Sequence, residues 1–328
     1  MPLTTAYMAL GSNQGDRMQH LRSALRLLQQ AGDLIVSQVS PAYENRAIGM
    51  GPAENFFNAV VEVSTSLSAE ALLARGLQVE DRLGRVRTGS WAPRTMDVDL
   101  LLYGATTLQT ERLHLPHPRI TERDFVLCPW LQIAPQLELH GRPLAAWVAA
   151  LPQVDLRQLE ERICCEPSVC IIAAVAENQV IGRAGQLPWS IAEDWSLFMR
   201  KTRGGTLLMG RQTFSQILQE PGWAEDRDYI VITSQPESVS RYGMRSAATV
   251  DAAMDLARQS DQPIWICGGE AIYRQALAWA DQLHLTQVHA EVDGDRYFPD
   301  WSETFKRELG CARSQDDKYS YTFKILER

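Results

Sequence analysis

Two carboxylates, Asp97 and Asp99, stand two residues apart in the apolar stretch from Met96 to Leu102. Alternate side chains of a β-strand point to opposite faces, so this spacing places both carboxylates on the same face. Two like charges held side by side repel each other unless a cation lies between them. Mg²⁺ suits such a pair, because it commonly takes one or two carboxylates and completes its shell with water and substrate phosphates. The pair therefore predicts a magnesium site for a phosphorylated substrate.

Three arginines and a tryptophan precede the carboxylates. Arg85, Arg87 and Arg94 carry planar guanidinium groups that suit phosphate oxygens. Trp91 lies among them and offers a flat ring for stacking on a base or a pterin. Taken alone, an alternation of Asp with apolar residues is equally typical of a half-exposed edge strand. The arginine cluster, the tryptophan and the run of leucines after Asp99 favour a site for a magnesium nucleotide.

The strand that carries the carboxylates follows three other predicted strands and two predicted helices. The strands span residues 7–10, 36–43 and 57–63, and the helices lie within residues 16–32 and 68–83. Asp16 and Ser68 suit the N-terminal caps of these helices, and Gly32 and Gly84 suit their ends. This order predicts an α+β sandwich with helices on one face of an antiparallel sheet, the ferredoxin-like plan.

The second half of the chain follows a different pattern. Its buried strands are predicted at residues 169–175, 206–209, 229–233 and 264–267, and its helices at residues 193–201, 211–218, 250–259 and 270–280. Alternating strands and helices predict an α/β domain with a mostly parallel sheet and helices on both faces. We interpret residues 153–167, which have a charged middle, as a linker between domains at residues 1–152 and 168–328.

Loops at the C-terminal ends of parallel strands bind ligands, and three of these loops carry suitable pairs of residues. The pairs are Gly210-Arg211, Thr233-Ser234 and Gly268-Gly269. Backbone N–H groups and hydroxyls at a helix start suit phosphate, so the loops predict a phosphorylated dinucleotide such as NADPH. Asp194, in the first turn of a predicted helix, is a second candidate. Attraction to the helix dipole explains most Asp residues at such positions, which leaves its role open.

Length, charge and cysteine content exclude several classes of protein. A chain of 328 residues predicts two domains, each with its own core. The net charge is −8, and residues 1–160 hold 14 basic and 16 acidic side chains, which argues against nucleic-acid binding. We find no apolar run of membrane-spanning length and no signal peptide, so we expect a cytoplasmic protein. The six cysteines show no metal-ligand spacing and are expected to be reduced thiols.

The region around the carboxylates resembles a known family. Gly84-Arg85-Val86-Arg87 and the stretch from Trp91 to Asp99 are similar to the signature of 6-hydroxymethyl-7,8-dihydropterin pyrophosphokinase, a folate-pathway enzyme. That enzyme moves pyrophosphate from ATP to a pterin alcohol. The resemblance covers about residues 5–150, and it implies that Asp97 and Asp99 bind Mg²⁺ with ATP. It also implies that Arg85 and Arg94 act in catalysis.

The same resemblance implies contacts to each substrate. Those to the pterin fall at Phe56, Asn58, Trp91 and Phe125, and those to the nucleotide fall at Glu80, Arg87, His117 and Arg123. Two positions depart from the family pattern. Asn45-Arg46 stands where the family commonly has Thr-Pro, and Ser90 stands where it often has a basic residue. We therefore expect weaker or differently placed contacts in the pterin-side loop, without loss of the reaction.

The second half, from about residue 168 onward, resembles dihydrofolate reductase. The matching segments are Val180-Ile181-Gly182, Leu187-Pro188-Trp189, Asp194, Phe198, residues 209–214, Leu285-Thr286 and residues 290–295. By position, Asp194 would hold the pterin and promote protonation at N5, a step that suits a carboxylate in an apolar pocket. Thr286 would bond Asp194, Phe198 would pack on the substrate, and Arg227 would pair with its glutamyl carboxylate.

This resemblance implies the cofactor site as well. The NADPH contacts would be Arg211, Gln212, Thr213, Thr233, Ser234, Gly268, Gly269 and Tyr273, the last beside the nicotinamide. A cis peptide is implied between Gly268 and Gly269, and a loop at residues 185–187 would close over the site. Glu270 stands where some members have a basic residue near the 2′-phosphate, and we still expect NADPH to be preferred over NADH.

Together these patterns predict a bifunctional enzyme whose small-molecule partners are pterins, ATP and NADPH. One alternative is that a single half is catalytic and the other serves as a scaffold or ligand-binding module. Another is that the first half is a ferredoxin-like RNA-binding module, because that architecture hosts many functions. An RNA-binding sheet needs surface aromatics and a basic face, and Asp97 with Asp99 on the sheet argues against it.

Overall fold

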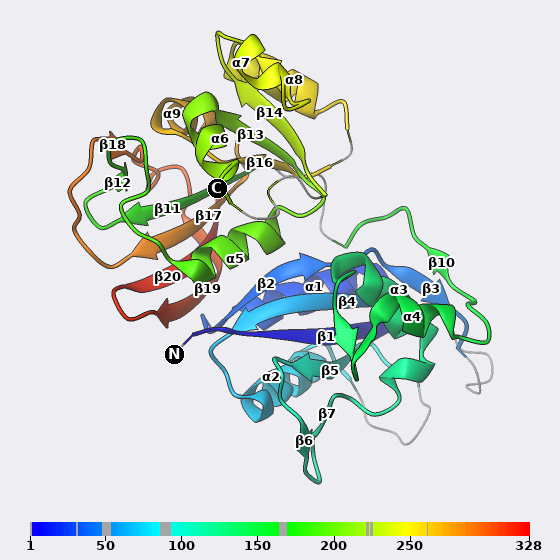
Figure 1. Cartoon of the computed structure of the whole chain (residues 1–328). Helices are drawn as coiled ribbons and strands as arrows, with labels where there is room; N and C mark the ends of the chain where they lie inside the picture. The colour runs from blue at the N-terminus through cyan, green and yellow to red at the C-terminus, as the bar shows by residue number, and fades with distance from the viewer. Residues whose placement is uncertain are drawn as a thin grey trace. The chain divides into compact units, whose positions relative to one another are not determined.

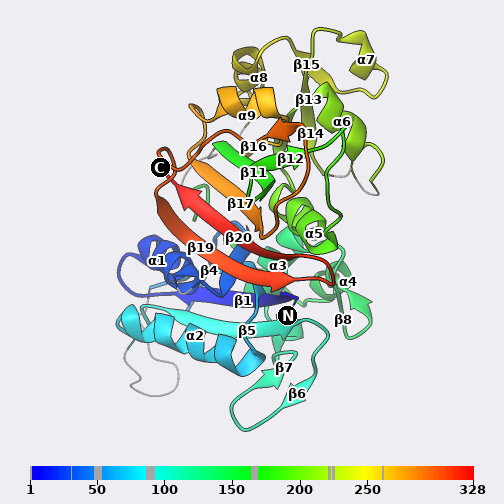
Figure 2. The same cartoon turned by 90° about the vertical axis from the view of Figure 1, so that its left-hand side faces the viewer.

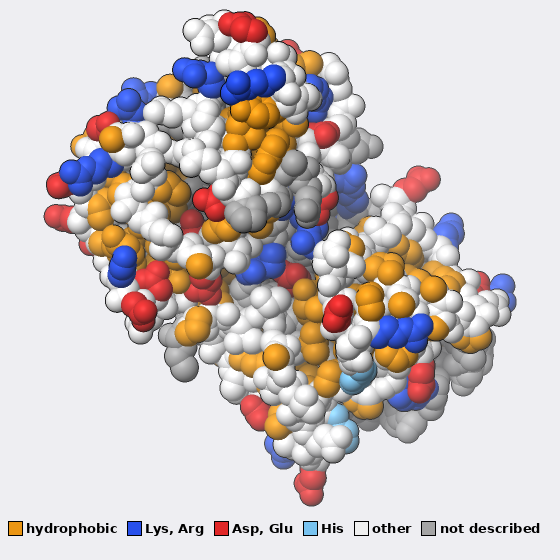
Figure 3. Space-filling view, in the orientation of Figure 1, with side chains coloured by type: hydrophobic (Ala, Val, Ile, Leu, Met, Phe, Trp, Pro, Cys, Tyr) orange, Lys and Arg blue, Asp and Glu red, His pale blue; other side chains and the backbone are white. Residues whose placement is uncertain are grey.

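A computed structural model of the chain describes residues 2–30, 32–47, 54–85, 93–163, 169–220, 223, 226–260 and 262–328. The chain divides into two compact units, one at residues 3–165 and one at residues 166–328. Each unit combines a sheet with helices (Figure 1). Every helix in these ranges is too short or too polar to cross a membrane. Acidic and basic side chains are interspersed on the face that Figure 3 shows.

The main sheet of the N-terminal unit is antiparallel. Its strands are β1 (Thr4–Ser12), β2 (Leu34–Val39), β3 (Tyr43–Asn45), β4 (Phe56–Thr65), β5 (Asp97–Tyr103) and β10 (Arg157–Gln158). β1 lies between β4 and β5, and the other edge of β4 pairs with β2 and β3. Two short ladders join β6 (Leu108–Gln109) to β7 (His114–Leu115) and β8 (Glu138–Leu139) to β9 (Arg142–Pro143). Among the described strands, the carboxylate strand β5 forms one edge of the main sheet.

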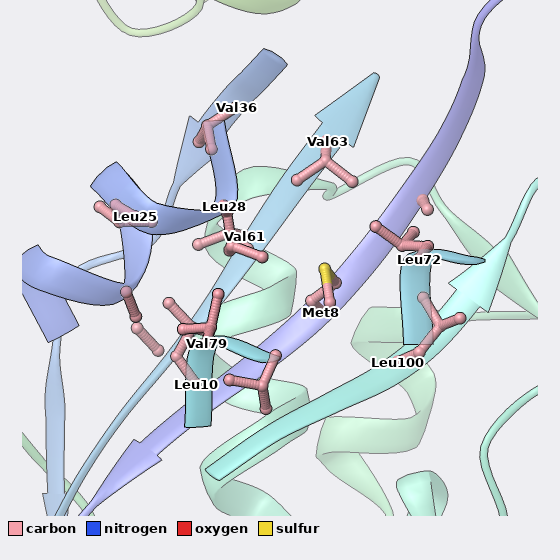
Figure 4. Packing of buried hydrophobic residues seen from close by; sticks show 14 of the residues in the cluster. Met8, Leu10, Leu25, Leu28, Val36, Val61, Val63, Leu72, Val79 and Leu100 are labelled. Atoms are coloured by element: carbon pink, nitrogen blue, oxygen red, sulfur yellow. The ribbon is translucent and has the colours of Figure 1, made fainter. Parts of the chain in front are cut away.

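Helices cover both faces of this sheet. They are α1 (Arg17–Gln29), α2 (Ala69–Arg82), the short helix η1 (Ile120–Glu122), α3 (Asp124–Ile133) and α4 (Leu144–Ala149). On one face, Leu28 of α1 and Leu72 of α2 are buried in one cluster with Met8 of β1 (Figure 4). On the other face, Trp130 of α3 packs on Tyr7 of β1, with ring centroids 5.2 Å apart. The prediction of helices on one face only was wrong, because β1 carries buried apolar side chains on both sides and needs two covering layers.

The predicted strand at residues 36–43 is two strands, β2 and β3, with a break between them. Pro41 lies in the break and has no backbone N–H to donate to a ladder. Ser40 holds the break to the sheet, because its Oγ accepts a hydrogen bond from the backbone N of Val60 at 2.9 Å. The prediction of one continuous strand was therefore wrong, and the break gives β3 a separate position along β4.

Part of the predicted linker packs on the N-terminal unit. β10 pairs with β3, and the backbone N of Leu159 donates to the carbonyl of Ala42 at 2.9 Å. Ile163 is buried in the core beneath α1 and α2. Residues 157–163 therefore extend the N-terminal sheet and its core. Cys164 and Cys165, two of the six cysteines, lie outside the described residues.

The C-terminal unit contains an eight-stranded sheet in the order β15-β14-β13-β16-β11-β17-β20-β19. The strands are β11 (Val169–Ala176), β13 (Thr206–Gly210), β14 (Asp228–Ile232), β15 (Arg245–Ala247), β16 (Ile264–Ile266), β17 (Gln282–Val288), β19 (Arg307–Gln315) and β20 (Ser320–Glu327). In this spatial order, each pair of neighbours among β15, β14, β13, β16, β11 and β17 is parallel. β17, β20 and β19 pair antiparallel and lie side by side in Figure 2. A separate ladder joins β12 (Val180–Gly182) to β18 (Arg296–Tyr297).

Helices cover both faces of the C-terminal sheet. They are α5 (Ala192–Lys201), α6 (Arg211–Ile217), α7 (Glu237–Ser240), α8 (Val250–Ala257) and α9 (Glu270–Ala276). α8 and α9 contribute Met254 and Ile272 to the core on one face, and α6 contributes Phe214 to the core on the other. β14, β13 and β16 are neighbours, so the loops at their C-terminal ends come together at one edge of the sheet.

Candidate active sites

Asp97 and Asp99 lie on the face of the N-terminal sheet that α3 covers. Val98 and Leu100 between and beside them are buried in the core on the opposite face, so the alternation of β5 turns both carboxylates toward α3. Asp97 retains 22 % of its side-chain exposure and Asp99 retains 37 %. Asp97 and Asp99 therefore share one face of β5, as the spacing of two residues predicts, and both carboxylates are accessible.

Two arginines hold Asp97. Nη1 of Arg85 lies 2.5 Å from Oδ1 of Asp97, and Nη1 of Arg94 lies 3.0 Å from Oδ2. Arg85 also pairs with Glu80, whose side chain is 2 % exposed and accepts a hydrogen bond from the backbone N of Val98 at 2.9 Å. Burial alone would lower the pKa of Arg85, but Asp97 and Glu80 beside it raise that pKa above its usual value. The guanidinium of Arg85 is thus fixed and charged.

Asp99 lies among a second set of charges. Burial and the neighbouring Asp97 raise the pKa of Asp99, whereas His117 and Arg123 act in the opposite direction. Nη1 of Arg123 lies 3.6 Å from Oδ2 of Asp99. Burial lowers the pKa of His117, with Asp99 opposing. Nδ1 of His117 and Nε of Arg94 are both buried without a hydrogen-bond partner among the described residues. Each nitrogen can therefore donate a hydrogen bond to an oxygen of a bound phosphate.

Magnesium fits this donor set. Two carboxylates share a face, and their repulsion contributes to the raised pKa of Asp99, which a divalent cation would offset. The described residues contain no group of three or more His, Cys, Asp or Glu side chains placed for a metal. A cation held by only two carboxylates would complete its shell with phosphate oxygens and water, as Mg²⁺ commonly does.

The predicted pterin contacts lie beside these charges. Phe56 and Asn58 are on β4, and Arg94 and Arg123 stand 5.5 Å and 5.8 Å from the ring centroids of Phe56 and Phe125 respectively. Asn58 is 7 % exposed, and its Nδ2 donates to Oδ1 of Asn45 at 2.5 Å. Aromatic rings and a fixed amide suit a flat heterocycle with polar edges.

Some predicted residues fall outside the described ranges, and others were missed. Arg87, Ser90 and Trp91 lie outside the described residues. Asn13 was not predicted as a site residue, yet its Oδ1 accepts from the backbone N of Arg94 at 2.8 Å and its backbone N donates to the carbonyl of Arg94 at 3.1 Å. Asn13 thereby positions Arg94, and no local pattern in the sequence links residues so far apart.

In the C-terminal unit, Asp194 lies in the first turn of α5 and faces Thr286 of β17. Oγ1 of Thr286 donates to Oδ1 of Asp194 at 2.6 Å, which is the bond that the resemblance implied. Asp194 keeps partial contact with solvent but is surrounded by enough protein that burial raises its pKa to about 6. Thr286 opposes this shift and Glu193 adds to it. The site therefore holds one carboxylate that retains its proton at unusually high pH.

Three aromatic residues lie on or just before the helix that carries Asp194. Phe198 stacks on Trp195, with ring centroids 5.2 Å apart and planes 19° apart. Trp189 is 6 % exposed, and its Nε1 is buried without a hydrogen-bond partner among the described residues. Trp195 was not predicted as a site residue, although it directly follows Asp194 in the sequence. These rings provide an apolar wall with a free donor for a flat substrate.

The three predicted phosphate loops lie on neighbouring strands. The backbone N of Gly210 donates to the carbonyl of Gly268 at 2.7 Å, which joins two of the loops. The predicted cis peptide between Gly268 and Gly269 is confirmed. Gly268 has a φ of +108°, and a Cβ there would lie 2.9 Å from the ring of Tyr273, so only glycine fits. The OH of Tyr273 donates to the carbonyl of Ile172 at 2.8 Å.

The remaining cofactor residues differ in exposure. Arg211, Gln212 and Ser234 are exposed, and Thr213 is half-buried at the start of α6. Thr233 is buried, and its Oγ1 accepts from the backbone N of Gln235 at 3.0 Å, so it shapes the turn. Bare glycine backbones flanked by an exposed arginine and a serine fit a phosphorylated dinucleotide.

Arg227 is bonded within the protein. Its side chain is 2 % exposed, its Nε donates to Oγ1 of Thr202 at 3.0 Å, and its Nη1 lies 3.0 Å from Oδ1 of Asp226. Another guanidinium nitrogen donates to the carbonyl of Met199. Burial lowers the pKa of Arg227, with Asp226 opposing. Arg227 thus anchors the C-terminal end of α5, and its contact with a glutamyl carboxylate stays a prediction.

Comparison with known proteins divides the chain at the same place. The family model for 7,8-dihydro-6-hydroxymethylpterin-pyrophosphokinase matches residues 7–135, and that for dihydrofolate reductase matches residues 168–328. The 2-amino-4-hydroxy-6-hydroxymethyldihydropteridine pyrophosphokinase of Bacillus subtilis is 46 % identical over 133 residues, covering 40 % of this chain and 80 % of that protein. The enzyme of the same name from Aquifex aeolicus is 36 % identical over 43 % of this chain and 89 % of its own length. The dihydrofolate reductase of Buchnera aphidicola is 32 % identical over 49 % of this chain and 99 % of its own length.

Proposed function

Because the chain belongs to the pterin pyrophosphokinase family in its N-terminal unit and to the dihydrofolate reductase family in its C-terminal unit, we propose that each unit holds the groups for its own reaction. The chain is a bifunctional enzyme of folate biosynthesis. It transfers pyrophosphate from ATP to 6-hydroxymethyl-7,8-dihydropterin, which releases AMP, and it uses NADPH to reduce 7,8-dihydrofolate to tetrahydrofolate.

In the pyrophosphokinase unit, Asp97 and Asp99 would hold the Mg²⁺ that accompanies ATP and neutralises phosphate charge. Arg85, Arg94 and Arg123 are placed to bind phosphate oxygens, and Glu80 keeps Arg85 in place. His117 adds a nitrogen on the same side. The pterin hydroxyl attacks the β-phosphorus while AMP leaves, a reaction that depends mainly on positioning and charge neutralisation.

The pterin binds between the aromatic and amide groups of the same face. Phe56 and Phe125 would flank its ring, and Asn58 would hydrogen-bond its edge. We also propose that Arg87 contacts a phosphate of the nucleotide and that Trp91 contacts the pterin; both lie outside the described residues. The observation that carries the assignment is the paired carboxylates facing three arginines on one side of the sheet.

Asp99→Asn tests the pyrophosphokinase assignment. The variant keeps the shape of the side chain and removes one charge from the metal site, so AMP release should fall at least about a hundredfold. Glu111→Gln, which removes a charge from an exposed loop, serves as the control and should keep full activity. Equal AMP release from Asp99→Asn and the unchanged protein would remove Asp99 from the metal site.

In the reductase unit, NADPH supplies the hydride, and the protein orients it and manages a proton. Asp194 holds the pterin through its carboxylate and keeps a proton available near N5, because burial raises its pKa to about 6. Thr286 orients Asp194, while Phe198 and Trp195 form the apolar wall. Gly268, Gly269 and Tyr273 shape the nicotinamide end, and Arg211 with Ser234 would bind the extra phosphate, supported by Gln212, Thr213 and Thr233.

Asp194→Asn tests the reductase assignment. An amide keeps the hydrogen bond to Thr286 but carries no exchangeable acid proton, so NADPH oxidation at neutral pH should fall about a hundredfold. Asp255→Asn, on the exposed side of α8, is the matched control. If Asp194→Asn oxidised NADPH as fast as the control, the proton would come from elsewhere.

The broader assignments follow from the same premise. We assign a ferredoxin-like sandwich to residues 1–152 and a dihydrofolate-reductase-like fold to residues 168–328, with residues 153–167 between them. The antiparallel order of β4, β1 and β5 supports the first fold, and the parallel pairing from β15 to β17 supports the second. A cytoplasmic location stays a prediction from the sequence.

A further inference from the structure

Asn45, a departure from the family pattern, contacts Asn58 at the end of β3. In the ladder between β3 and β4, Asn45 stands opposite Phe56, and Tyr43 stands opposite Asn58. Opposite residues of an antiparallel ladder turn their side chains to the same face. Asn45 therefore lies on the face that carries the two predicted pterin contacts, and Nδ2 of Asn58 donates to Oδ1 of Asn45 at 2.5 Å.

A second hydrogen bond fixes which end of each amide faces the other. Nδ2 of Asn45 donates to the carbonyl of Arg46 at 3.2 Å, so Oδ1 of Asn45 must point the other way, toward Asn58. Asn58 in turn must present Nδ2 to that oxygen. Its own Oδ1 then points at Gly11, where a built Cβ would come within 2.9 Å. Glycine at position 11 leaves the room that this orientation needs.

The orientation determines what Asn58 offers to a ligand. An amide has two N–H donors and one acceptor oxygen. With one donor used by Asn45, Asn58 offers one N–H and one oxygen in a fixed arrangement. A heterocycle with donors and acceptors along one edge fits only one of the two possible arrangements, and a turned amide would leave polar groups unpaired.

We propose that Asn45 is a positioning residue that fixes the amide of Asn58 for the edge of the pterin ring. The proposal rests on the function proposed for the N-terminal unit. The strand that carries Asn45 is itself held in place, because Glu44 pairs with Arg157 of β10 at 2.7 Å and the OH of Tyr43 donates to Oε1 of Gln158 at 3.0 Å. β10 thus supports the position of Asn45.

The test compares two substitutions of Asn45 in the full-length chain. Asn45→Leu removes the acceptor and keeps the branching of the side chain, and Asn45→Asp keeps an oxygen facing Asn58. AMP release is measured against the concentrations of 6-hydroxymethyl-7,8-dihydropterin and of ATP in turn. We expect Asn45→Leu to raise the KM for the pterin roughly tenfold and to leave the KM for ATP unchanged. Asn45→Asp should stay within about threefold of the unchanged protein.

Three controls separate positioning from general damage. NADPH oxidation by the same preparation reports the amount of intact chain and should be equal in all variants. Arg46→Ala changes a side chain that is 80 % exposed and should leave the KM for the pterin unchanged. Asn45→Ala removes the acceptor without adding bulk, so it should raise the KM for the pterin as Asn45→Leu does if the lost acceptor, and not the bulk of leucine, is responsible.

Each contrary result has a definite meaning. An unchanged KM for the pterin in Asn45→Leu and Asn45→Ala would overturn the proposal. So would an equal rise in Asn45→Asp, because the shape of the side chain and not its acceptor would then be responsible. A parallel rise in the KM for ATP would point to a general disturbance and would overturn it too. Absence of AMP release from the unchanged protein would instead refute the function of the unit.

Discussion

Asp97 lies between the guanidinium groups of Arg85 and Arg94, whereas Asp194 accepts a hydrogen bond from the hydroxyl of Thr286. The first carboxylate belongs to an edge strand and to a network of at least five charged side chains. The second lies at the start of a helix, where burial raises its pKa to about 6. The pyrophosphokinase unit thus surrounds its carboxylates with positive charge, whereas the reductase unit buries its carboxylate beside a neutral hydroxyl.

The contrast follows from the two reactions. Phosphoryl transfer involves several negative oxygens, and the protein assists chiefly by neutralising and aligning them. Hydride transfer to a pterin needs a proton at one nitrogen, and a buried carboxylic acid supplies or retains it near neutral pH. The same side-chain type therefore serves opposite purposes in one chain, and the surroundings decide which.

Removal of divalent cations should produce the largest difference between the two activities. Excess EDTA should lower AMP release by about a thousandfold, because the charge of ATP would lose its neutralising cation. NADPH oxidation in the same solution should not change. Added Mg²⁺ should restore AMP release. Persistence of AMP release without divalent cations would mean that the arginines alone suffice.

The pH dependence of NADPH oxidation should show the tuned carboxylate. Asp194 has a pKa of about 6, so the protonated fraction falls tenfold for each pH unit above that value. The rate constant for hydride transfer, measured in single turnovers, should fall by up to about fiftyfold between pH 6 and pH 8. A flat profile across this range in the unchanged protein would contradict the assignment of Asp194.

The same carboxylate should weaken the reductase fold at high pH. Its pKa is raised from 3.8 to about 6, so the folded state binds a proton that the unfolded state releases, and stability is lost as pH rises through this window. Asp194→Asn should therefore raise the free energy of unfolding at pH 8 by about 2 kcal/mol and change it little at pH 4. Urea unfolding identifies the reductase transition by its shift with added NADPH. Equal free energies of unfolding for the variant and the unchanged protein at pH 8 would contradict the claim that ionised Asp194 destabilises the fold.

Glu80→Ala should weaken the charged network of the other unit. Glu80 is 2 % exposed and pairs with Arg85, so its removal leaves a partly buried guanidinium with one carboxylate fewer. We expect a loss of about 3 kcal/mol in the unfolding free energy of the pyrophosphokinase unit and slower AMP release. Asp81→Ala, its exposed neighbour on α2, is the control. If Glu80→Ala and Asp81→Ala had the same unfolding free energy, the buried pair of Glu80 and Arg85 would not stabilise the unit.

Thr286→Val should have the smallest effect. The hydroxyl of Thr286 favours the charged form of Asp194, so its loss should raise the pKa of Asp194 further. The midpoint of the pH profile should then move upward by about one unit, with a modest loss of rate from the less oriented carboxylate. A downward move would show that the hydrogen bond favours the protonated form.

Local patterns predicted the parts of the molecule that depend on neighbouring residues. The period of two placed Asp97 and Asp99 on one face of β5. The predicted helix caps are confirmed, since Asp16 accepts from the backbone N of Gln19 at 3.0 Å and Ser68 accepts from that of Ala71 at 3.2 Å. Such features arise within a few residues, where the geometry of a helix or strand leaves few choices.

The features that were missed depend on distant residues or on sequence breaks. α3 contains Pro129, which obscures its helical pattern, and so the second covering layer of the sheet was not predicted. The hydrogen bond between Asn45 and Asn58 depends on the pairing of β3 with β4, which no periodicity reveals. The bonds of Arg227 within the protein depend on how α5 packs, and sequence position alone suggested only a ligand contact.

The most direct test measures both activities in four versions of the full-length chain: the unchanged protein, Asp97→Ala, Asp194→Asn and the double variant. We predict that Asp97→Ala loses AMP release and keeps NADPH oxidation, that Asp194→Asn does the reverse, and that the double variant loses both. If either single change silenced both reactions in a folded chain, the claim that each unit holds a complete site would be wrong.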